Sequence, residues 1–103
     1  MRRELELETA FRSYLEGVTS NVRVQRDYVA RCRTVSEYEG SLLDHYRQDL
    51  GKALINRLTY SADDESYGAK QRHSIPINGS IRNGTASYRS AVNRYFDLLR
   101  QRT

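Results

Sequence analysis

The spacing of the apolar residues constrains this fold more than any other feature, because it follows the 3.6-residue period of an α-helix through most of the chain. In the last segment, one helix face would carry Tyr88, Ala91, Val92, Tyr95, Leu98 and Leu99. The same spacing predicts main helices over about residues 4–16, 21–35, 41–60 and 85–99. We therefore expect a mainly α fold, a bundle of four or five helices.

Residues that favour helix ends separate these segments. Gly17 is expected to end the first helix, since glycine adopts the left-handed conformation at little cost. Thr19 or Ser20 would then cap the second helix. Ser41, followed three residues later by Asp44, resembles a capping box and predicts the start of the third.

The third segment is open to two interpretations. Gly51 costs about 1 kcal/mol relative to alanine inside a helix. The segment is therefore either one helix or two short helices that meet near Asp49, whose carboxylate would cap the second. The sequence Ser61-Ala-Asp-Asp64 repeats the capping pattern and predicts a single helical turn that stops at Gly68.

An irregular stretch over about residues 69–84 precedes the last helix and contains the only proline of the chain. Asn78-Gly79 lies between apolar residues, which is a strong hairpin signal because both central residues of a type I′ turn need a positive φ. Pro76 would place this hairpin at an edge. We expect a small two-stranded β-hairpin here, with Thr85 or a neighbour capping the last helix.

The size of the chain predicts one domain over residues 1–103. Cys32 is the only cysteine, so no internal disulfide can form, as is typical of proteins in a reducing cytosol. No apolar run approaches the roughly 20 residues that span a bilayer, and the first residues lack the continuous apolar stretch of a signal peptide. We expect a cytoplasmic protein without membrane contact, and leave its oligomeric state open.

Residues that catalyse reactions or bind metals do not come together in the sequence. Consecutive acids at residues 63–65 are explained by a helix start, because three successive side chains point in different directions. His45 and His73 lie far apart, and Cys32 has no CxxC companion, so a zinc site is not expected. No glycine-rich phosphate loop is present. We predict no catalytic activity, no metal and no cofactor.

The cationic residues point instead to a binding surface. Arginine accounts for 15 of the 17, and its planar guanidinium matches phosphate geometry better than lysine does. Residues 79–103 carry five Arg against one Asp, as much positive charge as the net +4 of the chain. We predict contacts with double-stranded DNA from the second helix, the hairpin region and the last helix, through Arg23, Arg26, Arg33, Arg72, Arg82, Arg89, Asn93, Arg94 and Arg100.

Four segments resemble the core-binding domain of tyrosine recombinases, the phage integrases. They are Phe11-Arg-Ser-Tyr-Leu15, the segment from Ser20 through Tyr28 to Val35, the segment from Leu54 to Leu58, and Thr85-Ala-Ser-Tyr-Arg-Ser-Ala-Val-Asn-Arg-Tyr-Phe-Asp-Leu-Leu99. The resemblance implies a SAM-like helical unit that forms half of a clamp around DNA, with its second and fourth helices near the duplex. Val24 stands where the family has threonine, and the region over about residues 70–84 has no counterpart in a minimal domain.

The family's catalytic residues lie in a separate domain, so the resemblance carries no activity over to this chain. It would be a stand-alone module or the non-catalytic N-terminal part of a larger recombinase or nuclease. A protein–protein interaction module, such as a small phage or defence-system adaptor or inhibitor, is the alternative. A continuous basic face that joins the second and last helices would favour DNA, whereas an exposed patch of Tyr and Leu would favour a protein partner.

Overall fold

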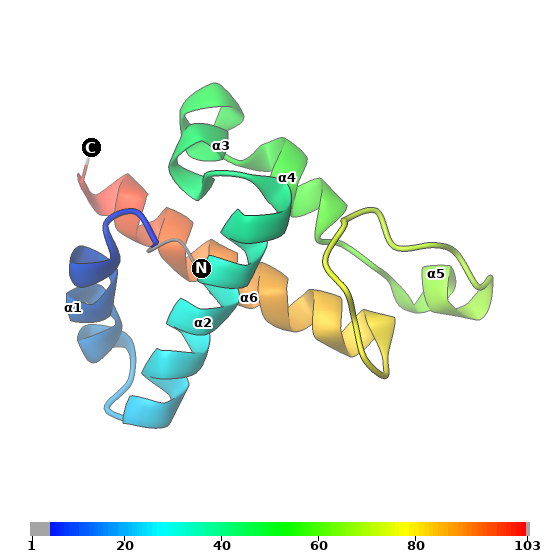
Figure 1. Cartoon of the computed structure of the whole chain (residues 1–103), viewed down its shortest axis with the longest axis horizontal. Helices are drawn as coiled ribbons and strands as arrows, with labels where there is room; N and C mark the ends of the chain where they lie inside the picture. Colours follow the sequence, from blue (N-terminus) through cyan, green and yellow to red (C-terminus); the bar gives the residue numbers. More distant parts are fainter. Residues whose placement is uncertain (1–4, 103) are drawn as a thin grey trace.

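The computed structural model describes residues 5–102, which form six helices and no strand (Figure 1). They are α1 (Glu8–Val18), α2 (Val22–Glu39), α3 (Leu42–Asp49), α4 (Lys52–Arg57), α5 (Ala62–Ser66) and α6 (Ile81–Arg102). The mainly helical fold is therefore confirmed. The most extensive helix contact joins α2 to α6, while α1, α3, α4 and α5 each pack on part of α6.

The first two helices differ from their predicted ends. Gly17 lies inside α1, which continues to Val18. Asn21 caps α2, because its side-chain Oδ1 accepts the backbone N–H groups of Arg23 and Val24 at 3.0 and 3.2 Å. The predicted capping residue Thr19 instead accepts the N–H of Asn21 through its hydroxyl. The helix α2 then runs beyond the predicted residue 35 and ends at Gly40, whose φ is +92°.

The segment from Ser41 onward forms two helices, so the second of its two interpretations is confirmed. Ser41 Oγ accepts the N–H of Asp44 at 3.2 Å, as predicted for the start of α3. The carboxylate of Asp49 accepts the N–H groups of Gly51 and Ala53 at 3.0 and 2.9 Å and so begins α4. Between the helices, Leu50 and Gly51 both adopt a positive φ.

Gly51 lies against the aromatic ring of Phe96 on α6. A Cβ at this position would lie 2.2 Å from Cε2 of that ring, and the φ of +79° disfavours any other residue. The turn between α3 and α4 can therefore pack closely on α6 only because it has no side chain.

The single turn predicted at Ser61 is confirmed as α5. The Ser61 hydroxyl accepts the N–H of Asp64 at 3.0 Å, and the Asp64 carboxylate accepts the N–H of Ser61 at 2.9 Å. These two bonds form a capping box. In Figure 1, α5 lies at the end of the molecule opposite α1.

The β-hairpin predicted around Asn78-Gly79 is wrong, since residues 5–102 contain no strand. Gly79 does adopt a positive φ of +86°, but the chain then enters α6 directly. Ser80 Oγ accepts the N–H of Asn83 at 3.1 Å, so a serine cap starts the helix where a second strand was expected. The preceding extended segment packs on α6 instead of pairing with a strand: Ile75 is fully buried, and a Cβ on Gly84 would lie 2.9 Å from Ile77.

The earlier start of α6 changes the role of Thr85, which is buried inside the helix rather than capping it. Its Oγ1 lies 2.8 Å from Nε2 of His73, whose Nδ1 accepts the N–H of Ile75 at 3.1 Å. Because Nδ1 is an acceptor, the ring is neutral and its proton is on Nε2. Burial lowers the pKa of His73, against the opposing effect of the Glu39 carboxylate.

The same loop is fixed to the end of α2 by Glu39, whose side chain is only 8% exposed. One carboxylate oxygen accepts from Nε of Arg57 at 2.7 Å, and the other from the N–H of Ser74 at 3.0 Å. Burial alone would raise the pKa of Glu39, but the bonds from Ser74 and Arg57 outweigh it and hold the pKa below its usual range. This carboxylate thus joins α2, α4 and the loop before α6.

One hydrophobic core lies among α1, α2, α4 and α6. Its fully buried side chains are Phe11, Leu15, Cys32, Val35, Leu54, Leu58, Ile75, Ala91, Val92, Tyr95 and Phe96. The rings of Phe11 and Tyr95 meet edge to face, with centroids 5.3 Å apart. Cys32 packs as a small apolar residue, as predicted, and its Sγ lies 3.3 Å from the carbonyl oxygen of Ala91.

Gly51→Ala should strongly destabilise the fold, because it combines a left-handed backbone with a clash against Phe96. We expect a loss of at least about 2 kcal/mol in the free energy of unfolding, measured by urea denaturation. Gly17→Ala is the matched control, since a Cβ there meets nothing within 4 Å. It should stabilise α1 by about 0.5–1 kcal/mol. Equal effects of the two substitutions would contradict the packing described.

Stability should fall as the pH decreases below about 6.5, the usual pKa of histidine. The folded pKa of His73 is lowered, so below this pH the unfolded chain binds a proton that the folded chain rejects. Glu8 and Glu39, whose pKa values are also lowered, should add a second decline below about 4.5. Urea midpoints measured between pH 4 and 8 test this. The first decline should vanish in His73→Gln, and its persistence there would exclude His73 as the cause.

Candidate nucleic-acid interface

The residues predicted to contact DNA fall into two groups in the structure. In the first group, the guanidinium group bonds to a carboxylate or to a backbone carbonyl oxygen of the chain. In the second, it bonds to no carboxylate or carbonyl oxygen among residues 5–102. The division decides which arginines offer an uncompensated charge to a phosphate.

Arg33 belongs to the first group. Its Nε and Nη2 bond to the two carboxylate oxygens of Glu8 at 2.7 and 2.6 Å, which joins α2 to the first turn of α1. Arg12 reaches the same carboxylate at 3.3 Å. The bond from Arg33 is the main reason that the pKa of Glu8 lies below its usual range, against the effect of burial. Arg33 thus contributes to helix packing rather than to an open basic face.

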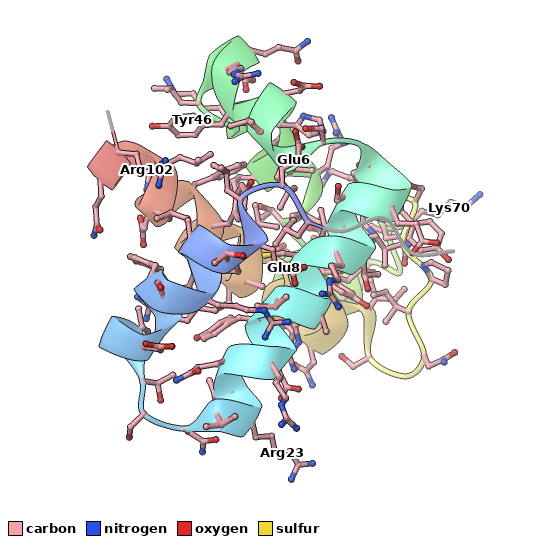
Figure 2. All side chains as sticks on the ribbon, turned by 60° about the vertical axis from the view of Figure 1, so that its left-hand side comes forward. Glu6, Glu8, Arg23, Tyr46, Lys70 and Arg102 are labelled. Atoms are coloured by element: carbon pink, nitrogen blue, oxygen red, sulfur yellow. The ribbon has the colours of Figure 1, made fainter. Side chains whose placement is uncertain are left out.

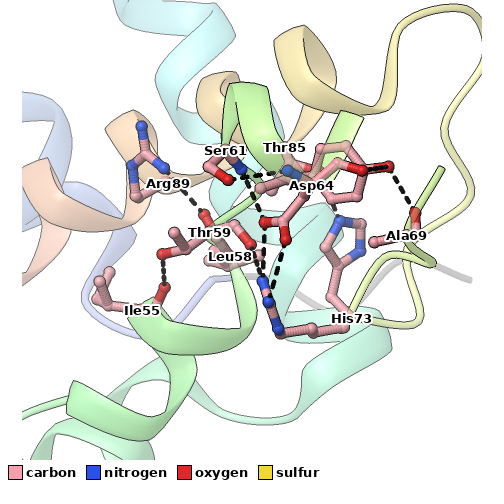
Figure 3. A network of polar contacts seen from close by, with 11 residues as sticks. Ile55, Leu58, Thr59, Ser61, Asp64, Ala69, His73, Thr85 and Arg89 are labelled. Atoms are coloured by element: carbon pink, nitrogen blue, oxygen red, sulfur yellow. Dashed lines mark hydrogen bonds and ion pairs between the residues drawn. The ribbon is translucent and has the colours of Figure 1, made fainter. Parts of the chain in front are cut away.

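Arg72 and Arg89 also bond within the chain, in the network of Figure 3. Nη1 of Arg72 donates to the carbonyl oxygen of Thr59 at 2.7 Å and pairs with Asp64 at 3.3 Å. The pKa of Asp64 is lowered, first by the N–H of Ser61 and then by Arg72. Nη1 of Arg89 lies 3.4 Å from the carbonyl oxygen of Leu58. The two arginines therefore bind the chain between α4 and α5.

The two ends of α6 carry the remaining ion pairs of the predicted set. Arg82 lies 3.9 Å from Glu65 of α5, and both side chains are about half exposed. Arg100 pairs with Asp97 one turn earlier. The positive charge of residues 79–103 is therefore partly neutralised and does not form one continuous basic face along α6.

The second group lies on the outward side of α2. Arg23 and Arg26 are exposed, and neither forms an ion pair with a described acid. Figure 2 shows Arg23 pointing away from the body of the molecule at the start of α2. Arg31 also has no ion pair among residues 5–102, although it was not predicted as a contact. Asp27 is the one acid on this part of the helix.

Arg31 lies at the edge of a shallow hollow of about 320 Å³ between α2, α6 and the loop before α6. The other lining residues are Pro76, Ile77, Asn78, Gly84, Ser87 and Tyr88. Arg31 lies next to the apolar stripe of α2 in the sequence pattern and was not among the predicted contacts. The extended loop, which sequence reasoning assigned to a hairpin, creates the open edge beside it.

Arg94 joins this side of the molecule from α6. It bonds to the hydroxyl groups of Tyr28 and Tyr14, which raise its pKa, and no described acid pairs with it. Arg94 thus contacts α2 at Tyr28, and we call Arg23, Arg26, Arg31 and Arg94 together the α2 arginine face. Asn93 is exposed on α6, and its side chain forms no hydrogen bond within residues 5–102.

Residues 5–102 contain no group of three His, Cys, Asp or Glu side chains arranged to hold a metal ion. None of the helices in this range is long and apolar enough to cross a membrane. No family model, characterised protein or solved structure matches the chain.

Arg33→Ala should lower the free energy of unfolding by about 1–2 kcal/mol, because it removes a two-bond pair between α1 and α2 and leaves the Glu8 carboxylate with Arg12 and the N–H of Leu5. Arg26→Ala, on the same helix but without a described ion pair, should change it by less than about 0.5 kcal/mol. Urea denaturation at pH 7 measures both. A larger loss of unfolding free energy in Arg26→Ala than in Arg33→Ala would contradict the assignment of these two arginines to different groups.

Proposed function

We propose that the chain is a DNA-binding module that contacts duplex phosphates through the α2 arginine face. The observation that carries the proposal is that none of these four guanidinium groups forms an ion pair with a described acid. Uncompensated arginines cost little in water and gain charge-assisted bonds when a phosphate approaches. Their contribution would be largely independent of base sequence.

The dimensions of α2 support this proposal. Arg23 and Arg31 are eight residues apart, which corresponds to about 12 Å along a helix. The major groove of B-form DNA is also about 12 Å wide. If α2 lies across the groove, the backbone positions of these two arginines would therefore be about one groove width apart. No residue on this face is predicted to recognise a particular base.

The other predicted contacts remain part of the proposal in a secondary role. Arg33, Arg72, Arg82, Arg89 and Arg100 would each have to exchange a carboxylate or a backbone carbonyl oxygen for a phosphate, so their net contribution to binding should be smaller. Asn93 could donate to a phosphate without such an exchange.

The test is fluorescence anisotropy of a labelled 25-base-pair duplex titrated at several salt concentrations. With three to four phosphate contacts, the slope of log K against log salt should be about −3 to −4. Arg23→Ala with Arg26→Ala should weaken binding at low salt roughly tenfold and reduce the slope by about 2. Arg47→Ala with Lys52→Ala is the matched control, because it removes the same charge from α3 and α4.

Three outcomes separate the possibilities. Binding that weakens only in the α2 variant supports the proposed face. Equal weakening in both variants would show that DNA affinity depends only on net charge, and it would exclude the α2 arginine face as the site. No binding at low salt would exclude the proposed function.

A further inference from the structure

A second surface, at the other end of α2 from Arg23, is apolar. A hollow of about 490 Å³ lies between the segment before α1, the helix α3 and the end of α6. Its walls include Leu7, Leu43, Tyr46, Leu50 and Leu99. Leu7 and Leu50 are 38% and 56% exposed, so their apolar side chains meet water. Figure 2 places Tyr46 and Arg102, which also line the hollow, on the same side of the molecule.

The two exposed leucines share an unusual backbone conformation. Leu7 has a φ of 57° and Leu50 a φ of 62°, and they are the two residues other than glycine with a positive φ in the described part of the chain. The left-handed region disfavours a leucine and favours glycine or asparagine. Both residues also occupy helix caps: Leu7 precedes α1 and forms no side-chain cap bond, and Leu50 follows α3. Folding alone thus favours a different residue at each position.

The rim of the hollow carries positive charge. Arg102 forms no ion pair with a described acid, and Arg47 lies 3.9 Å from Asp44, with both of these side chains about 70% exposed. Glu6, next to Leu7, is bonded to the hydroxyl of Ser41. A second copy of the chain would bring Arg47 and Arg102 against the same arginines. Carboxylates beside an apolar side chain would instead complement both the walls and the rim.

We propose that this hollow binds an acidic amphipathic helix of a partner protein, with the apolar side chains of that helix between Leu7 and Leu50 and its carboxylates against Arg47 and Arg102. Recognition of this kind uses apolar residues at i, i+3 or i+4, and i+7 of the bound helix. Leu7 and Leu50 lower the stability of the fold at these positions, and their side chains would instead contact the partner helix. The site does not depend on DNA binding, since it shares no residue with the α2 arginine face.

The test uses three labelled 16-residue helical peptides and fluorescence anisotropy. The first has Leu at i, i+4 and i+7 with flanking Glu, the second replaces Glu with Lys, and the third replaces Leu with Ser. The wild-type chain should bind the first peptide at least tenfold more tightly than the other two. Arg102→Glu should reverse the preference between Glu and Lys. Equal binding of the Glu and Lys peptides, or no binding of any peptide, would overturn the proposal.

Leu50→Asn separates binding from folding. Asparagine tolerates the left-handed conformation, so the melting temperature should stay unchanged or rise while affinity for the first peptide falls at least tenfold. Leu7→Asn should act in the same way, since asparagine also favours a helix N-cap. Tyr67→Ser, at a residue that is 87% exposed beside α5, is the control and should leave peptide binding unchanged. Unchanged binding in Leu50→Asn would exclude the hollow as the site.

Sedimentation tests the other possible occupant of the hollow, which is a second copy of the chain. A wild-type dimer that becomes a monomer in Leu50→Asn would show that a second copy covers the hollow, which would overturn the acidic partner. DNA affinity should be the same in Leu50→Asn and in the wild-type chain, so a failure of one proposal does not affect the other.

Discussion

The close contact of α2 with α6 is the constraint on which the rest of the structure depends. At this contact, Cys32 and Ala91 are fully buried small residues, and the cysteine Sγ lies within 3.3 Å of a backbone carbonyl oxygen. A larger side chain at either position would separate the helices, because protein interiors are packed to crystal-like density. The remaining helices are short; α1, α3 and α4 bury apolar side chains against this pair, whereas α5 has no buried residue. The same packing determines which side of α2 is left to solvent.

The distribution of acidic residues determines which arginines remain available. Glu8, Glu39 and Asp64 each form bonds between separate elements; Glu8 pairs with Arg12 and Arg33, and the other two each pair with one arginine. Acidic residues are nearly absent from the first half of α2, where Asp27 stands among several arginines. The basic character of the surface is therefore local, although the excess of arginine extends over the whole sequence. Net charge by region was a poor guide because it ignores pairing between elements distant in the sequence.

Local chemistry explains what could be predicted from the sequence. The periodic apolar residues identified the main helices, and side-chain caps at Ser41, Asp49 and Ser61 could be recognised because each acts within a few residues. The hairpin was wrongly predicted because Asn78-Gly79 is compatible with either a turn between strands or an entry to a helix. Ser80 and the burial of Ile75 decide between them, and the second of these is a tertiary effect. Arg31 was missed for the same reason, since the loop beside it is placed by packing on α6.

The bond between Tyr95 and the segment before α1 affects how the chain can fold during synthesis. The Tyr95 hydroxyl donates to the carbonyl oxygen of Glu6 at 2.7 Å, across 89 positions of sequence. The earliest described residues are thus held by the last helix, as are Phe11 and Cys32. Contacts between such distant residues close only after the intervening chain has been made. A ribosome-bound chain that lacks α6 would lack the side chains that complete the core for α1 and α2, so these helices pack fully only after α6 has been made.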